Sequence, residues 1–241
     1  MKKLLLITAL VLIIAVALSG CVPKISDDSY NVMNIFTKSR MYTFERTEDE
    51  SIRDVVYDIK VEGNIISTKV EISFEAGQFR SESEFYADTL IPISAYKGNS
   101  YALDPAQNWD IYAQYNDVLN MTAKSSEETE MKTLDLPEHY VDNEALLFSM
   151  GALEYEQGFT KDINVAIIDA GDIVTFRVSY QGLETIEVPY GTIECIKVEV
   201  KYTGLVLGAK PKMYMWYTND EQRLPVMYEN RGIFLKLKDV S

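Results

Sequence analysis

Two side chains of the sequence have the chemistry of a general base or a nucleophile, and neither has a partner at a useful spacing. His139 is the only histidine, so a zinc site built from several histidines is excluded. We interpret His139 as a surface residue, with a general base or a pH-sensitive hinge as the alternative. Cys195 lies beside Glu194 in an expected strand, where the acidic neighbour disfavours a reactive thiolate. We therefore expect Cys195 to be a buried small hydrophobic residue.

Three acidic clusters, at residues 48–50, 127–130 and 219–221, have the oxygen ligands that calcium prefers. None has the Asp-x-Asp-x-Asp-Gly spacing of a calcium-binding loop, so we interpret them as solvated turns. The sequence also has no phosphate-binding loop, no Gly-x-Ser-x-Gly motif and no dinucleotide fingerprint. It predicts no catalytic residue, no metal site and no cofactor, and we expect that the protein is not an enzyme.

The remaining candidate site is a set of apolar side chains in one expected strand, residues 212–218. Met213, Met215 and Tyr217 alternate there with Trp216 and another aromatic residue, so the strand is apolar on both faces. One face must cover the core, and the other must be covered by a helix, a second sheet, a partner or a lipid. Flexible methionines beside aromatic rings suit an adaptable apolar pocket. These four residues are the predicted apolar ligand site, with ordinary core packing as the alternative.

The start of the chain has the organisation of an export signal. Lys2 and Lys3 precede an apolar run at residues 4–18, which falls short of the roughly 20 residues that a membrane-spanning helix needs. The segment from Leu18 to Cys21 resembles a bacterial lipobox, which implies that the Cys21 thiol is lipidated and becomes the mature N-terminus. The alternative is an ordinary secreted protein that is cleaved elsewhere and keeps Cys21 as a spare thiol.

These features divide the chain into a signal peptide at residues 1–20, a lipidated tether at 21–29 and a β domain at 30–241. Removing the signal peptide takes away two lysines and no acid, so the net charge changes from −14 to −16. Such an acidic surface disfavours nucleic acid and electrostatic docking on anionic lipid. We expect the acyl chains on Cys21 to hold the protein outside the cytoplasm at the cell membrane, or at an outer membrane where the cell has one. With Cys21 lipidated, Cys195 has no disulfide partner.

The elements that position these residues are expected to be antiparallel strands. Apolar and polar residues alternate on both sides of Gly63-Asn64, which predicts a two-residue hairpin loop within residues 55–86. In the predicted register Val61 faces Ile66, Ile59 faces Thr68, Tyr57 faces Val70, Val55 faces Ile72, and Asp58 meets Lys69 in a favourable cross-strand pair.

Three further turns of this kind are predicted. Ala76-Gly77 would place Phe74 opposite Phe79, Gly98-Asn99 would set Tyr96 against Tyr101, and Ala170-Gly171 would place Ile167, Val165 and Ile163 opposite Val174, Phe176 and Val178. Further strands are expected near residues 31–46, 109–124, 183–188, 192–203, 212–218, 224–229 and 233–238.

One segment departs from the strand pattern. Residues 142–152 begin with capping side chains and have apolar positions at helical spacing, which predicts one short helix. Residues 124–136 are charged and weakly patterned, and we interpret them as an edge strand or as a loop between two sheet halves joined near residues 124–142. The predicted fold is mainly β: a curved antiparallel meander sheet, half-barrel or sandwich-like, with one short helix.

The C-terminal half carries a family resemblance. Residues 188–193 read V-P-Y-G-T-I, residues 216–226 contain a tryptophan, an Asn-Asp loop and Leu-Pro-Val, and residues 233–237 fit a final strand. The region 140–238 thereby resembles a family of exported bacterial β proteins of unknown function, numbered 3108. The same Trp–loop–Leu-Pro arrangement is similar to the periplasmic lipoprotein carriers, which implies a curved sheet around a hydrophobic cavity.

Two functions fit these observations. The first is a membrane-anchored lipoprotein that binds an apolar ligand, such as a lipid or an acyl chain, and acts as a carrier or sensor at the membrane surface. The alternative is a structural lipoprotein of the cell envelope, with a filled core and no small ligand, that acts through contacts with envelope proteins.

Overall fold

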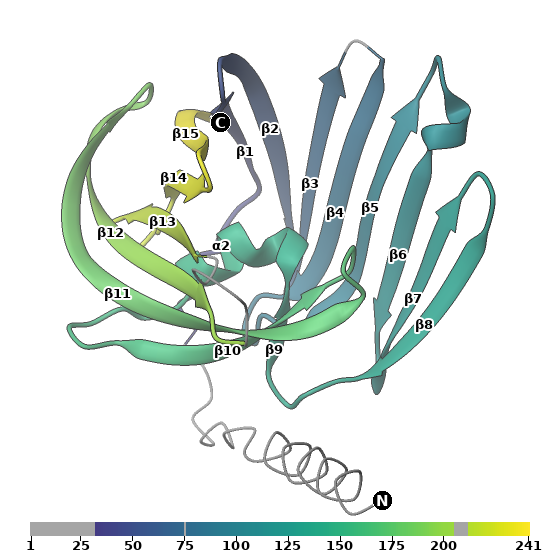
Figure 1. Cartoon of the computed structure of the whole chain (residues 1–241). Helices are drawn as coiled ribbons and strands as arrows, with labels where there is room; N and C mark the ends of the chain where they lie inside the picture. Colours follow the sequence, from purple (N-terminus) through teal and green to yellow (C-terminus); the bar gives the residue numbers. More distant parts are fainter. Residues whose placement is uncertain (1–31, 75, 205–211) are drawn as a thin grey trace, which may run out of the picture.

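The computed structural model describes residues 32–74, 76–204 and 212–241, and within them it contains a single sheet of fifteen strands (Figure 1). The strands in chain order are β1 (Arg40–Glu48), β2 (Ser51–Glu62), β3 (Ile65–Phe74), β4 (Gly77–Tyr86), β5 (Pro92–Tyr101), β6 (Trp109–Tyr115), β7 (Val118–Ser125), β8 (Thr129–Asp135), β9 (Tyr140–Asp142), β10 (Thr160–Ile167), β11 (Asp172–Val188), β12 (Gly191–Tyr202), β13 (Lys212–Thr218), β14 (Pro225–Asn230) and β15 (Ile233–Val240). The helical elements are the 3-10 turns η1 (Pro105–Gln107) and η2 (Asn143–Ala145) and the α-helix α2 (Leu146–Gly151). The signal peptide, Cys21 and the tether predicted from the sequence lie outside the described residues.

The sheet consists of two meanders that are joined by the pairing of the first strand with the last. Strands that follow one another in the chain are neighbours, except β8 and β9, which lie at the two edges of the sheet. Because β1 pairs with β15, the order runs from β8 through β1 and β15 to β9. All pairs are antiparallel except β9 with β10. We call β1–β8 the N-terminal limb and β9–β15 the C-terminal limb. The sheet curves strongly and stays open, as the predicted mainly β, curved meander requires (Figure 1).

The predicted register is confirmed for the first hairpin. Val61 pairs with Ile66, Tyr57 with Val70 and Asp58 with Lys69. Gly63 has a φ of +64°, the left-handed backbone that the two-residue turn needs. Alternation and turn geometry agree here, so the register is fixed.

The other three hairpin predictions are wrong in register. Phe74 pairs with Gly77 and not with Phe79, and Val165 pairs with Val174 and not with Phe176. Gly98 and Asn99 lie inside β5, where Gly98 pairs with Asp110 of β6.

Gly77 and Gly98, which the sequence analysis placed in hairpin loops, lie where neighbouring atoms leave no room for a side chain. A Cβ atom on Gly77 would lie 2.0 Å from the Ser100 carbonyl oxygen, and one on Gly98 would lie 2.6 Å from the Tyr96 hydroxyl. Both distances are far inside van der Waals contact. Glycine at these positions therefore allows close approach of neighbouring atoms rather than marking a hairpin loop.

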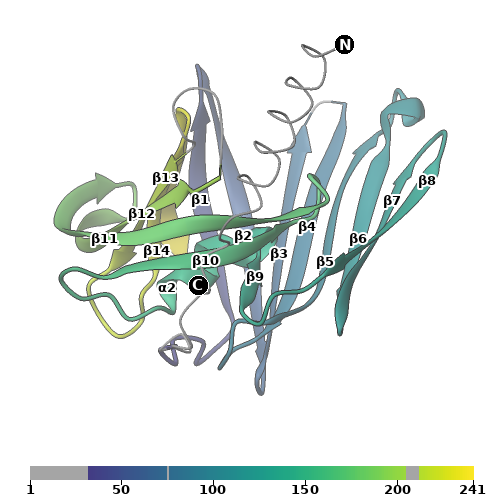
Figure 2. The same ribbon diagram turned by 60° about the horizontal axis from the view of Figure 1, so that its bottom comes forward.

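The predicted helix is present and is buried on the concave side of the sheet. The Asp142 carboxylate caps η2 by accepting the Glu144 backbone N–H at 2.8 Å, and α2 follows with all six residues buried. Figures 1 and 2 both place α2 between the two limbs. Gly151 lets the helix approach β13, because a Cβ there would lie 3.0 Å from the Tyr217 ring. The Tyr217 hydroxyl donates to the Leu147 carbonyl at 2.7 Å and ties the strand to the helix.

The two limbs also touch away from the helix. Ala95, Ile111, Ala113, Tyr115, Leu119 and Met121 of β5–β7 form one apolar cluster with Tyr140, Ala166 and Ile168 beside β9 and β10. At the edge of the N-terminal limb, Lys132 of β8 donates to the Gly171 carbonyl at 2.6 Å. Residues 129–135 form β8, which stands at one end of the strand order, so this part of the segment 124–136 is an edge strand. No helix among the described residues is long and apolar enough to cross a membrane.

Candidate functional site

An open cavity of about 460 Å³ is hollowed into the concave side of the sheet, beside α2. Its apolar lining comes from β2–β4, from the helix and from β13–β15, and consists of Val55, Tyr57, Val70, Ile72, Phe74, Phe79, Leu146, Leu147, Met213, Met215, Tyr228, Ile233 and Leu235. The polar lining is Arg46, Arg53, Ser81, Lys97, Asn143 and Glu144. An apolar cavity with a few charged groups is the usual form of a small-molecule site.

A second hollow of about 500 Å³ is larger but has the opposite character. Its lining is mainly charged or hydroxylated, as in Asp58, Lys60, Glu82 and Ser94. Such side chains are well solvated without a ligand, so volume alone does not identify a site. The apolar lining makes the concave cavity the stronger candidate.

The sheet alternation decides which of the predicted apolar residues reach the cavity. Met213 and Met215 line it. Tyr217, on the same face of β13, is fully buried beneath the helix. Trp216 points to the other face, where its indole N–H donates to Glu184 at 3.0 Å and the Lys197 ammonium lies 4.9 Å from its ring centroid. The structure thus brings two of the four residues to one cavity.

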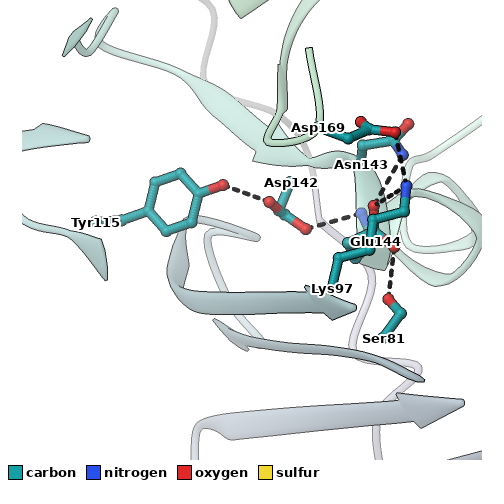
Figure 3. A network of polar contacts seen from close by, with 7 residues as sticks. All are labelled: Ser81, Lys97, Tyr115, Asp142, Asn143, Glu144 and Asp169. Atoms are coloured by element: carbon teal, nitrogen blue, oxygen red, sulfur yellow. Dashed lines mark hydrogen bonds and ion pairs between the residues drawn. The ribbon is translucent and has the colours of Figure 1, made fainter. Parts of the chain in front are cut away.

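The polar residues of the lining other than the two arginines belong to a network of polar contacts, which Figure 3 shows. Lys97 of β5 lies 3.1 Å from a Glu144 carboxylate oxygen and 3.0 Å from Asp169. The Ser81 hydroxyl donates to the other Glu144 oxygen at 2.5 Å. Behind Glu144, the Tyr115 hydroxyl donates to the Asp142 carboxylate. Residues from both limbs and from η2 therefore meet in one set of hydrogen bonds and ion pairs.

Burial dominates the protonation of this network. It raises the pKa of Asp142 from 3.8 to about 7, with the nearby Glu144 charge adding to the effect. Burial, and then the Asp142 charge, also raises the pKa of Tyr115. Burial opposes the charged form of Lys97, but Glu144 and Asp169 outweigh it and raise the pKa of the ammonium. Asp142 is thus half protonated near neutral pH, while Lys97 stays charged.

The two residues with nucleophile or base chemistry lie away from the cavity lining. Cys195 is fully buried, and burial with the charges of Glu184 and Glu194 raises its thiol pKa to about 12. It has the buried position predicted for it. The backbone carbonyl of His139 accepts an Asn164 side-chain N–H at 3.0 Å. Among the described residues, no three His, Cys, Asp or Glu side chains lie close enough to share a metal ion.

The sequence interpretation missed the charged members of the lining. Arg46 and Arg53 occupy apolar-parity positions, two residues after buried Phe44 and two residues before buried Val55. A charged residue where the alternation predicts an apolar one indicates a functional position, and it can be found from the sequence. Lys97 and Glu144 carry no such signal, because their meeting depends on how η2 lies across the sheet.

An open, barrel-like antiparallel sheet that wraps a short buried helix and keeps an apolar cavity defines the class of this protein. The chain belongs to the family described as protein of unknown function, DUF3108, whose model matches residues 29–232. This confirms the resemblance found in the sequence and extends it over the N-terminal limb.

One solved structure shares the fold at low sequence identity. A beta-barrel-like protein of the domain of unknown function DUF1849 from Brucella abortus is 10% identical with a TM-score of 0.52, over 88% of this chain and 98% of that one. A protein from Parabacteroides distasonis, provisionally described as a lipoprotein, is 10% identical with a TM-score of 0.35, over 90% of this chain and 100% of that one. At this identity the likeness to the Brucella protein shows the fold alone. None of the curated proteins compared with the chain matches it in sequence.

Proposed function

We propose that this protein is an exported lipoprotein, anchored through Cys21, that binds a lipid or an acyl chain in the cavity on the concave side of its sheet. The observation that carries the proposal is the apolar lining. Thirteen hydrophobic side chains from both limbs and the helix surround an open volume of about 460 Å³. Apolar surface left in water costs roughly 25 cal/mol per Å², so a ligand that covers it is stabilised.

The lining has properties that suit a flexible chain. Met213 and Met215 have unbranched, polarizable side chains that adapt to different shapes. Leu146 and Leu147 belong to a short helix that packs on the sheet. An acyl chain forms no hydrogen bonds, and these methionine and leucine side chains have no hydrogen-bonding groups that would be left unpaired.

The sequence at the N-terminus supports the location. The apolar run that leads to Cys21 favours export and lipidation. Two acyl chains hold a protein at a bilayer where one is marginal. Because the net charge of the chain without its signal peptide is −16, electrostatic attraction to anionic lipid would not do so.

The test is native mass spectrometry of the full chain, released from non-ionic detergent micelles, with fragmentation of any bound lipid. We expect a one-to-one lipid adduct in addition to the covalent anchor. Ile72→Trp would fill the cavity and remove the adduct, because Ile72 lines it. Ile52→Trp is the matched control, since Ile52 is 66% exposed and is not in the lining. Wild-type protein without any adduct, and unable to take up added palmitate, would contradict the proposal and favour the filled-core, protein-interaction alternative.

A further inference from the structure

Two arginines stand directly opposite each other inside the cavity. Arg46 of β1 pairs in register with Arg53 of β2, and both line the cavity next to the β1–β2 turn. Like charges at opposed positions of an antiparallel pair destabilise a sheet. On the same face, the pair on one side is Phe44 with Val55, both buried and apolar, and the pair on the other side is Glu48 with Ser51 at the turn. The two arginines therefore lie where the apolar surface of the cavity ends.

The charges around this pair do not balance. Glu48 lies 2.7 Å from Arg46 and 3.5 Å from Arg53, through the same carboxylate oxygen. Within the described part of the chain, no other carboxylate lies at ion-pair distance from either guanidinium. Two positive charges thus share one negative charge. The remaining cation of the lining, Lys97, has the opposite arrangement, with Glu144 and Asp169 both at ion-pair distance.

We propose that the ligand of the cavity is an amphiphile with one acidic head group, a carboxylate or a phosphate, that Arg46 and Arg53 bind together. This inference rests on the proposed function and adds the chemical class of the ligand. Guanidinium groups match carboxylate and phosphate oxygens with paired N–H donors. The acid supplies the negative charge that the arginine pair lacks. Its acyl chain then lies along the apolar lining that begins with Val55 and Leu235.

The register supports this placement of the chain. Val55 and Tyr57 follow Arg53 on the same face of β2, and Leu235 of β15 pairs with Arg46. All three are in the cavity lining. A head group at the arginines therefore points its chain towards α2. Elsewhere the net charge of −14 repels anions, so an acidic ligand needs this local excess of positive charge.

The test is a titration of the full chain, in non-ionic detergent, followed by native mass spectrometry with three probes of equal chain length. Palmitate carries a carboxylate, palmitoyl lysophosphatidylglycerol carries a phosphate, and monopalmitoylglycerol carries no charge. We expect at least one of the two acids to bind about tenfold tighter than the uncharged probe, as expected for charged hydrogen bonds. Comparison of the two acids identifies the source of the head group.

The variants are Arg46→Gln and Arg53→Gln, with Arg177→Gln as the control. Arg177 is an exposed arginine of β11 that pairs with Asp162 outside the cavity. Each cavity variant should reduce the preference for the acid about tenfold and leave binding of monopalmitoylglycerol unchanged, while the control changes neither. The melting temperature of the ligand-free cavity variants should stay the same or rise, because a like-charge pair is removed.

Each outcome decides between the two proposals. Equal binding of the acids and the uncharged probe would overturn the head-group inference and leave the proposed function standing. An acid preference that survives both substitutions, together with a lower melting temperature, would show that the arginines serve only the sheet. Binding of none of the probes would overturn the proposed function and this inference with it.

Discussion

The cavity contains two ionic clusters that differ in exposure and in charge. In the first, Lys97 and Glu144 are 16% and 8% exposed, Asp169 at the rim is 44% exposed, and one ammonium lies between two carboxylates. In the second, Arg46, Arg53 and Glu48 are 18%, 37% and 40% exposed, and two guanidiniums share one carboxylate. The buried cluster connects the two limbs and the helix and has its donors and acceptors paired. The exposed cluster has an excess of one positive charge. We therefore assign a structural role to the Lys97 cluster and propose a ligand-binding role for the arginine cluster.

The largest expected effect tests the structural assignment of the buried cluster. Replacing Lys97 by Met removes the cation that lies between Glu144 and Asp169. Breaking a buried ion pair by removing one partner leaves an uncompensated charge, and we expect the free energy of unfolding to fall by about 3 kcal/mol. Denaturant unfolding measures this. A loss below about 1 kcal/mol would mean that the cluster is as well solvated as the arginine pair.

A pH dependence of stability is the next effect in size. Because burial raises the pKa of Asp142 from 3.8 to about 7, the folded protein holds a proton there that the unfolded chain has released. The contribution is fully present below about pH 4 and is lost as the pH rises to about 7, by a few kcal/mol at most. Asp142→Asn keeps a capping side chain and removes the titration.

The measurement is the difference in unfolding free energy between wild type and Asp142→Asn at a series of pH values from 4 to 8. We expect the wild type to lose stability relative to the variant across this window. A difference that is independent of pH would show that Asp142 keeps its ordinary pKa. Asp54→Asn is a suitable control, because Asp54 is a surface residue paired with Lys238.

The smallest expected effect concerns the exposed cluster. Glu48→Gln removes the one carboxylate that lies on Arg46 and Arg53. Both guanidiniums are then available to a ligand, so the affinity for an acidic amphiphile should rise a few-fold, while stability changes by less than about 1 kcal/mol. Titration with palmitate checks the first part and thermal unfolding the second. Weaker binding would mean that Glu48 positions the arginines rather than competing for them.

The hairpins show how far the sequence determines this fold. The β2–β3 register could be predicted because alternation and the left-handed Gly63 agree on one loop. The turn near Gly171 was misplaced because Ile168 leaves the ladder and packs in the cluster between the limbs. Gly98 was misread because its missing side chain makes room for the Tyr96 hydroxyl. A Cβ atom on Gly98 would also lie 2.9 Å from the Trp109 carbonyl oxygen of β6, and the position of Ile168 depends on the opposite limb. Such contacts depend on the tertiary structure, so the alternation pattern of one strand does not predict them.

Some residues of the candidate site could likewise be identified from the sequence, and others could not. Met213 and Met215 could be placed on one face from their spacing alone, and the structure puts both in the cavity. Arg46 and Arg53 occupy positions where the alternation of their strands predicts an apolar residue, so the sequence alone could have identified them as exceptions. The meeting of Lys97, Asp142 and Glu144 depends on how the two limbs fold around the helix, which no local pattern describes.

The pairing of β1 with β15 has a consequence for the order in which the chain folds. β1 begins at residue 40 and β15 at residue 233, so the pairing between the limbs closes a loop that contains all the strands from β2 to β14. Each limb consists mainly of neighbouring hairpins that can form early, whereas this long-range pairing carries a large entropic cost and forms slowly. We expect the folding chain to pass through a state with a formed N-terminal limb whose apolar concave face is still uncovered. A chaperone that shields that face until β15 pairs with β1 would prevent aggregation at the stage of greatest exposure.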